Sequence, residues 1–278
     1  MRTVRFAKGH GTGNDFVIVA DRHNTMPLSE RDVRALTDRH FGIGGDGLLR
    51  AVKAGHVPEW DGDPDLWFMD YRNADGSIAE MCGNGLRVFA RYLLENDLMT
   101  RNQVATRAGL RGVAVTPDGT FTVEMGAVSF GPDVEVTLTD QAGTGQTWTG
   151  VSVDVGNPHA VVLLDEGTDL AALAVERQPT WQPDEAFPHG ANVEFVVPTG
   201  ERSLSLRVHE RGSGETLSCG TGVVASAAAF ARARGTGSGD YAVTVPGGQL
   251  TVTLADDGNA LLTGQAEIVA TGETRLPD

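Results

Sequence analysis

The sequence predicts an α/β fold of the α+β type, with two pseudo-symmetric domains that each wrap a mixed sheet around one central helix. The main observation is a repeated pattern, Cys-Gly-x-Gly followed by a long apolar run, which occurs at Cys82 and again 137 positions later at Cys219. The second observation is that strand-like segments with Asp-Gly and Gly-Asn turns occur in both halves. Because self-similarity on this scale indicates duplication, we predict one domain at 1–126 and another at 127–278, each with one cysteine.

The first half contains one clear amphipathic helix and one clear hairpin. Residues 29–40 predict a surface helix, because Ser29 is a capping residue and Val33 and Leu36 form an apolar stripe. Residues 113–125 alternate apolar and polar side chains around an Asp-Gly turn, which predicts a hairpin.

The second half repeats these features. Residues 140–150 are rich in Gly and Thr and fit either a hairpin tip or a linker. The run VVASAAAFA after Cys219 is apolar on every helical face, so it predicts a helix enclosed on all sides. Residues 250–264 predict another hairpin. The motifs GNDF at 13–16 and GNPH at 156–159, 143 positions apart, also support the duplication.

Composition limits the classes of function. Of the 278 residues, 40% are hydrophobic and 21% charged, which is typical of a globular protein. The formal net charge of −15 disfavours nucleic acid and anionic membranes as partners. No signal-peptide core or membrane-length apolar run is present, which predicts a cytoplasmic location. The only lysines, Lys8 and Lys53, leave few candidates for a pyridoxal phosphate Schiff base, so we do not expect this cofactor.

The two cysteines suit proton transfer. Each would stand at a helix N-terminus, where unpaired backbone N–H groups and the helix dipole favour a thiolate. Gly83 and Gly220, which follow them, allow a substrate carboxylate to approach the backbone. Stereoinversion at an α-carbon without a cofactor needs one group to remove a proton and another to deliver one to the opposite face. We therefore predict that Cys82 and Cys219 form an acid/base pair.

Six sequence blocks stand in order along nearly the whole chain. They are GTGNDF (11–16), FGIGGDGL (41–48), RNADGSIAEMCGNGLR (72–87), GNPH (156–159), GANVEF (190–195) and ERGSGETLSCGTG (210–222). Together they resemble the diaminopimelate epimerase family. The resemblance implies a cofactor-independent enzyme that interconverts LL- and meso-2,6-diaminopimelate in lysine and peptidoglycan-precursor synthesis, with its site between two domains.

The resemblance also implies residue roles. Cys82 and Cys219 become the proton donor and acceptor, and His159 and Glu210 orient or tune the thiols. Backbone N–H groups would hold the α-carboxylate, at Gly83, Asn84, Gly220 and Thr221. Side chains that would bind the rest of the substrate are Asn14, Asn73, Asn157, Asn192, Glu210 and Arg211.

Three further expectations come from the family. Some members carry a substrate-binding Gln where this chain has Gly47, so the role of that loop stays open. The family is often dimeric, which implies a homodimer here. Its last strand crosses back to the first domain, which places residues 265–278 with the N-terminal half.

Other functions remain open at this point. Each cysteine could be a small buried structural residue. Proline or hydroxyproline racemases also use paired cysteines, although a small ring substrate would leave the extra Asn and Arg ligands unused. In a different class, Cys82, Cys219, His159 and Glu210 could form a zinc site, whereas the acid/base interpretation expects no metal.

Overall fold

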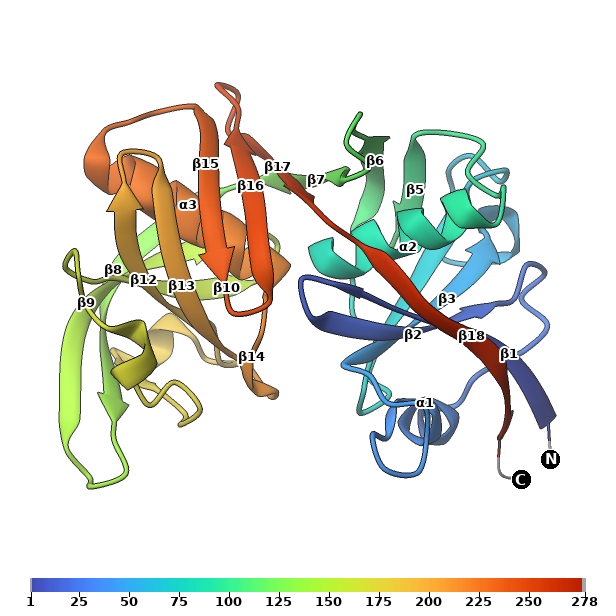
Figure 1. The fold of residues 1–278 in the computed structure, drawn as a ribbon, viewed down its shortest axis with the longest axis horizontal. Coiled ribbons are helices and arrows are strands. Elements are labelled where there is room, and N and C mark those ends of the chain that lie inside the picture. The colour runs from blue at the N-terminus through green and yellow to red at the C-terminus, as the bar shows by residue number, and fades with distance from the viewer. Residues whose placement is uncertain (1, 277–278) are drawn as a thin grey trace. The chain divides into compact units, whose positions relative to one another are not determined.

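The computed structural model describes residues 2–276, and the chain divides into two compact units (Figure 1). Unit 1 comprises Met1–Val123 with Gly264–Asp278, and unit 2 comprises Glu124–Thr263. The predicted boundary after residue 126 falls inside β7 (Phe121–Ala127), the strand in which the units divide. Each unit combines a mixed sheet with a long helix, so the predicted α+β fold class is confirmed.

Unit 1 contains a mixed sheet and two helices. Its strands are β1 (Arg2–Gly11), β2 (Asn14–Ala20), β3 (Gly47–Lys53), β4 (Trp67–Asn73), β5 (Gln103–Thr106), β6 (Gly109–Val115) and β18 (Glu267–Leu276). Its helices are α1 (Glu30–Thr37), α2 (Gly83–Glu95) and a short 3₁₀ turn at Ala54–His56. Strands β18, β1 and β2 are antiparallel neighbours, β2 and β3 are parallel, and β3 and β4 are antiparallel. The last strand, β18, therefore belongs to the sheet of unit 1, beside β1.

Helix α2 is the central helix of unit 1. It packs against β1, β2, β3, β4 and β18. Its first eight residues, 83–90, are all buried. Gly9 of β1 allows this close packing, because a Cβ at that position would lie 2.9 Å from Cγ1 of Val88 in the helix.

Unit 2 repeats the plan with a larger sheet. Its strands are β8 (Ser129–Thr139), β9 (Gly145–Asp154), β10 (Pro158–Leu163), β11 (Thr180–Gln182), β12 (Asn192–Gly200), β13 (Ser203–Glu210), β14 (Gly214–Thr216), β15 (Gly239–Val245), β16 (Gly248–Leu254) and β17 (Asn259–Gly264). Its helical segments are α3 (Gly220–Arg234) and 3₁₀ turns at Leu170–Ala172 and Asp184–Ala186. The ladder runs β11, β8, β9, β10, β12, β13, β15, β16, and it is parallel only at β10–β12 and β13–β15.

Strands of unit 2 pass across α3, as Figure 1 shows. The helix packs against β9, β10, β12, β13, β15 and β16, and residues 220–231 are all buried. The prediction of an enclosed helix after Cys219 is therefore confirmed. Small side chains make this possible, since the run is mostly alanine. The helix ends at Gly235, whose φ of 64° is the left-handed C-terminal conformation that glycine favours.

The other predicted elements are also present. Ser29 caps α1 in a capping box with Asp32, and Val33 and Leu36 are buried. Residues 113–125 form the end of β6 and most of β7, which pair as a hairpin. Residues 140–144 are the tip of the β8–β9 hairpin, so this segment is not a linker.

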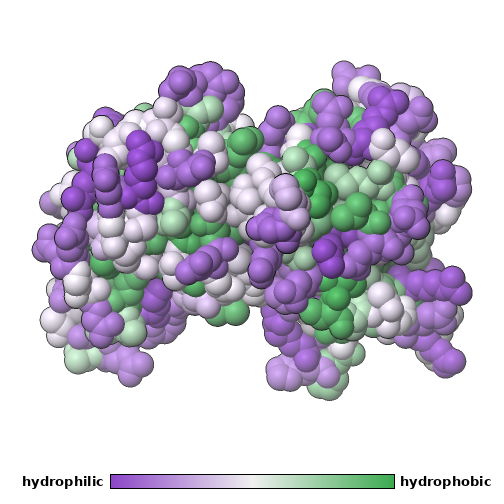
Figure 2. All heavy atoms as spheres, turned by 45° about the horizontal axis from the view of Figure 1, so that its top comes forward, coloured by the Kyte–Doolittle hydropathy of each residue, from purple (hydrophilic) through white to green (hydrophobic). Residues whose placement is uncertain are grey.

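Hydrophilic residues cover most of the face drawn in Figure 2, and hydrophobic residues form smaller groups among them. Within residues 2–276, none of the helices has the length and apolarity needed to span a membrane.

Candidate active site

Cys82 stands at the N-cap of α2. Its backbone is extended (φ −142°, ψ 120°), and its Sγ accepts a hydrogen bond from the backbone N–H of Gly85 at 3.4 Å. The next residues, Gly83 and Asn84, start the helix and therefore carry N–H groups that have no partner within the helix ladder. This first half-site has the anion-favouring geometry that the Cys-Gly-x-Gly pattern predicts.

Side-chain amides surround the Cys82 sulfur. Its thiol donates to Asn14 Oδ1 at 3.7 Å, and the same oxygen accepts from Asn84 Nδ2 at 3.3 Å. Asn84 is held in turn by Arg87, whose Nη2 donates to Asn84 Oδ1 at 2.5 Å. Asn14, Cys82 and Asn84 are thus brought together from two separate sequence blocks.

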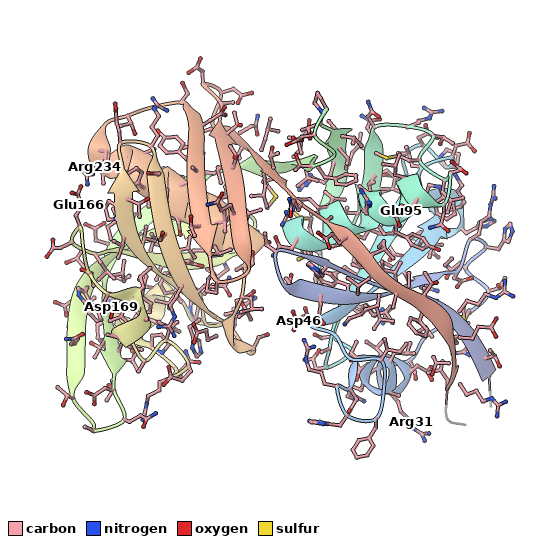
Figure 3. All side chains as sticks on the ribbon, in the orientation of Figure 1. Arg31, Asp46, Glu95, Glu166, Asp169 and Arg234 are labelled. Atoms are coloured by element: carbon pink, nitrogen blue, oxygen red, sulfur yellow. The ribbon has the colours of Figure 1, made fainter. Side chains whose placement is uncertain are left out.

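Asn14 is fixed by a charged cluster before β3. Its Nδ2 donates to Asp46 Oδ2 at 2.7 Å, and Asp46 is labelled in Figure 3. Arg39 Nη2 forms ion pairs with both Asp46 and Asp15, each at 2.7 Å. Lys8 contacts Asp15 at 2.5 Å. Burial alone would raise the pKa of Asp15, but the hydrogen bonds and charges of Arg39 and Lys8 lower it well below its usual range.

Gly47 has no room for a side chain. A Cβ there would lie 2.7 Å from the carbonyl oxygen of Arg72 and 2.8 Å from Cε2 of Tyr71. The Tyr71 ring occupies this space, and its hydroxyl donates to Asn73 Oδ1 at 2.9 Å. Asn73 also donates to Ser77 Oγ at 3.0 Å. A side chain at position 47 would therefore collide with the Tyr71 ring and with the backbone of Arg72.

Cys219 stands at the N-cap of α3 in the same extended conformation (φ −114°, ψ 113°). It is 6% exposed, and its Sγ lies 3.5 Å from the hydroxyl of Thr221. Burial raises the pKa of the Cys219 thiol well above its ordinary value, and the negative charges of Glu210 and Glu194 raise it further. The Thr221 hydroxyl and the Gly222 N–H oppose this shift without overcoming it.

His159 and Glu194 form a buried pair near Cys219. Both side chains are fully buried, and His159 Nδ1 lies 2.7 Å from Glu194 Oε1. These two atoms share one hydrogen bond, and the tautomer of His159 decides which of them carries the proton. His159 Nε2 faces Asn157 Oδ1 at 3.0 Å, which joins two predicted residues. Among the described residues, Glu194 Oε2 has no hydrogen-bond partner although it is buried.

Glu210, Arg211 and Asn192 lie at adjacent strand ends. Asn192 Oδ1 accepts from the backbone N–H of Arg211 at 2.9 Å, and Arg211 is exposed. Glu210 accepts from Thr216 Oγ1 at 2.5 Å. The guanidinium of Arg211 bonds only weakly, to the carbonyl of His189 at 3.3 Å, so it is available to a ligand.

Sequence reasoning missed three residues. Arg87 and Glu194 lie inside the quoted blocks, and each is a charged residue within an otherwise buried element. That mismatch was a usable signal, since charges are rarely buried without a function or a partner. Tyr71 had no such signal. Within residues 2–276, no group of three or more His, Cys, Asp or Glu side chains is placed to hold a metal ion.

The fold and the cysteine-capped helices define the class of protein. A solved hydroxyproline epimerase from Agrobacterium vitis, with bound trans-4-hydroxy-L-proline, shares the fold, with a TM-score of 0.69. The match covers 100% of this chain and 94% of that one at 16% identity, so it concerns the fold alone. The class is thus the two-unit fold found in that epimerase.

Sequence comparison identifies the family within this class. The diaminopimelate epimerase family model matches residues 6–131 and 151–273. A diaminopimelate epimerase of Streptomyces coelicolor is 49% identical over 97% of this chain and 95% of the relative. Another, from Corynebacterium glutamicum, is 46% identical over 99% of both chains. The chain belongs to the diaminopimelate epimerase family.

Proposed function

We propose that this protein converts LL-2,6-diaminopimelate to meso-diaminopimelate, with Cys82 and Cys219 as its acid/base pair. The observation that carries the proposal is that each unit presents one cysteine at the N-cap of a buried helix, in a chain of this family. Two thiols in matched settings are what inversion at one carbon requires.

The N-terminal turns of α2 and α3 would bind the α-carboxylate. The candidate donors are the backbone N–H groups of Gly83, Asn84, Gly220 and Thr221, and a helix N-terminus favours a negative charge there. The same N–H groups would stabilise the negative charge that develops when the α-proton leaves.

Proton transfer then follows in one direction or the other. One sulfur, as thiolate, takes the α-proton, the electron pair of the broken C–H bond stays on the carbon, and the opposite thiol donates a proton to that carbon. In the proposal His159 and Glu194 orient this exchange at Cys219, and Glu210 contributes its charge there.

The distal amino acid end of the substrate would bind to polar groups at strand ends. Candidate ligands are Asn14, Asn73, Asn157, Asn192, Glu210 and Arg211. Arg211 is suited to a carboxylate because its guanidinium is exposed and weakly bonded within the protein.

The first experiment follows exchange and turnover together. In D₂O, we expect deuterium to enter the α-position of diaminopimelate. We expect Cys82→Ala and Cys219→Ala each to reduce epimerisation by at least about 10²–10⁴-fold, the usual contribution of a positioned acid or base. Near wild-type turnover in either variant would refute the two-cysteine mechanism. Proline and hydroxyproline assayed in parallel should not be racemised.

The second experiment tests distal recognition. Arg211→Met should impair turnover of diaminopimelate more than that of an analogue without the distal carboxylate. Arg234→Met is the matched control, because Arg234 pairs with Glu166 at the end of α3 (Figure 3). Equal losses on both substrates would remove Arg211 from the distal site.

The remaining parts of the proposal are a cytoplasmic location, action without a cofactor, and assembly as a homodimer. The family resemblance supports action without a cofactor and assembly as a homodimer. Sedimentation of the purified protein tests the dimer, and activity after exhaustive dialysis against a chelator tests the independence from metal.

A further inference from the structure

Arg87 is a fully buried cation in the second turn of α2, five positions after Cys82. Its guanidinium donates to the carbonyl of Gln265 at 2.9 Å and to the side-chain oxygens of Asn84 and Thr12 at 2.5 and 3.2 Å. All of these acceptors are neutral. A buried charge without an opposite charge is costly, so this position requires an explanation.

Most other cations on the elements around α2 are paired with a carboxylate of unit 1. The pairs are Arg2 with Asp32, Arg5 with Glu273, Lys8 with Asp15, His10 with Glu267, Arg50 with Asp21 and Asp70, Arg72 with Asp70, and Arg91 with Glu95. Within residues 2–276, the exceptions are Lys53, which donates to the carbonyl of Asp65, and Arg275, which is exposed. Near the sulfur, Asp46 is likewise paired, with Arg39. Among the described residues, no carboxylate forms an ion pair with Arg87, which distinguishes it from this group.

The ionisable group whose negative charge would act on Arg87 is the Cys82 thiol. Burial lowers the pKa of Arg87 to about 10, and the negative charge of Cys82 is the contribution that raises it. The contacts also place Arg87 close to the sulfur. Arg87 holds Asn84, Asn84 donates to Asn14 Oδ1, and that oxygen lies 3.7 Å from Cys82 Sγ. When Cys82 is protonated it donates to Asn14 Oδ1, and when it is ionised its sulfur keeps the hydrogen bond from the backbone N–H of Gly85 at 3.4 Å.

Unit 2 lacks this feature at the matching position. Five residues after Cys219, α3 carries Val224, which is fully buried. The charged groups that act on Cys219 are instead the carboxylates of Glu194 and Glu210, which oppose its ionisation. The two helices are thus alike in their capping cysteines and opposite in the charge placed behind them.

We propose that Arg87 is the counter-charge of the Cys82 thiolate, so that the enzyme without substrate holds Cys82 as thiolate and Cys219 as thiol. Arg87 acts through Cys82 and is therefore a positioning residue. Its consequence for catalysis rests on the proposed function. The free enzyme would first accept the stereoisomer whose α-proton faces Cys82. That proton passes to the Cys82 sulfur, the C–H electron pair stays on the carbon, and Cys219 supplies the proton to the opposite face.

The wild-type protein provides the first test, without any substrate. Under reducing conditions, iodoacetamide alkylation is followed across pH, and peptide mass spectrometry gives the rate at each cysteine. Because only the thiolate reacts, the midpoint of each rate profile reports the pKa of that thiol whatever its accessibility. We expect the midpoint for Cys82 to lie below that for Cys219. The reverse order, or coincident midpoints, would overturn the proposal.

Variants then assign the effect to Arg87. In a Cys219→Ala background, Arg87→Met should raise the midpoint for Cys82 by about one pH unit or more, the usual effect of removing a neighbouring opposite charge. Arg87→Lys should retain most of the effect. Arg91→Met is the control, because Arg91 lies one turn further along α2 and pairs with Glu95 (Figure 3). It should leave the midpoint unchanged.

An unchanged midpoint in a folded Arg87→Met variant would refute the role of Arg87. If that variant does not fold, Arg87→Lys and the order of the wild-type midpoints decide the matter. A separate assay with diaminopimelate tests the proposed function. Failure of that assay alongside the expected midpoints would refute the substrate and leave the thiolate assignment intact.

Discussion

Replacing Gly222 with alanine should destabilise the half-site around Cys219 and lower the pKa of its thiol. Gly222 occupies the first turn of α3, and its hydrogen faces Glu194. A Cβ at this position would lie 3.1 Å from Glu194 Cδ and still closer to Oε1. Glu194 is fully buried and bonded to His159, so it cannot move without losing that bond. Gly222→Ala therefore displaces the carboxylate that acts on Cys219.

The magnitude follows from opposing effects. A lost hydrogen bond between charged groups costs about 1.5–3 kcal/mol, whereas alanine gains up to about 1 kcal/mol over glycine in a helix. Gly85 of α2 is the matched control, because its Cβ would meet side-chain carbons of Leu49 at 3.3 Å, Cys82 at 3.4 Å and Phe16 at 3.5 Å, with no charged group among them. Gly85→Ala has the same helix gain without the lost bond. We expect Gly222→Ala to be less stable than Gly85→Ala by about 1.5–3 kcal/mol.

Urea denaturation of the two variants and the wild type measures the difference in the free energy of unfolding. Alkylation of Cys219 across pH measures the pKa of its thiol. Displacing Glu194 moves a negative charge away from the sulfur and should therefore lower that pKa. Equal stabilities, with an unchanged Cys219 profile, would show that Glu194 is not packed against Gly222 and would refute the geometry of the half-site.

Three other expectations concern unit 1. Asp70→Asn should lower the free energy of unfolding by about 3–5 kcal/mol, because Asp70 is 1% exposed and its loss leaves Arg50 and Arg107 without their shared carboxylate; a loss below about 1 kcal/mol in urea denaturation would contradict this. Burial alone would raise the pKa of Asp70, but its arginine neighbours, Arg107 foremost, lower it. The stabilisation of the protein by ionised Asp70 should thus be complete above the unfolded pKa of about 4 and be lost as the pH falls below it. The free energies of unfolding of wild type and Asp70→Asn should therefore converge in acid, and a difference that grows in acid would contradict this. Ser29→Ala should cost about 1 kcal/mol by removing the capping box with Asp32, and an unchanged unfolding midpoint would show that the cap contributes nothing.

The predictable part of the fold was the part encoded in local periodicity. The capping box of α1, the hairpin around Asp118 and the enclosed α3 each need only a short window of sequence, and the structure confirms all three. Parallel pairings such as β2–β3 and β10–β12 were not predictable in this way. They join segments separated by long connections, and no local pattern records which strands will meet.

The residues of the candidate site also differ in how far the sequence predicts them. Asn14, Cys82 and Asn84 could be assigned from motifs, because repetition marks them. Arg87 and Glu194 could not be assigned from repetition, because one half places a cation behind its cysteine and the other a carboxylate. Their signal in the sequence was a charge within an otherwise apolar stretch. In the proposed mechanism, proton transfer needs one thiolate and one thiol. Two identical thiols that share a site could each hold the proton equally well, whereas unequal charges behind the two sulfurs would favour one assignment of that proton over the other.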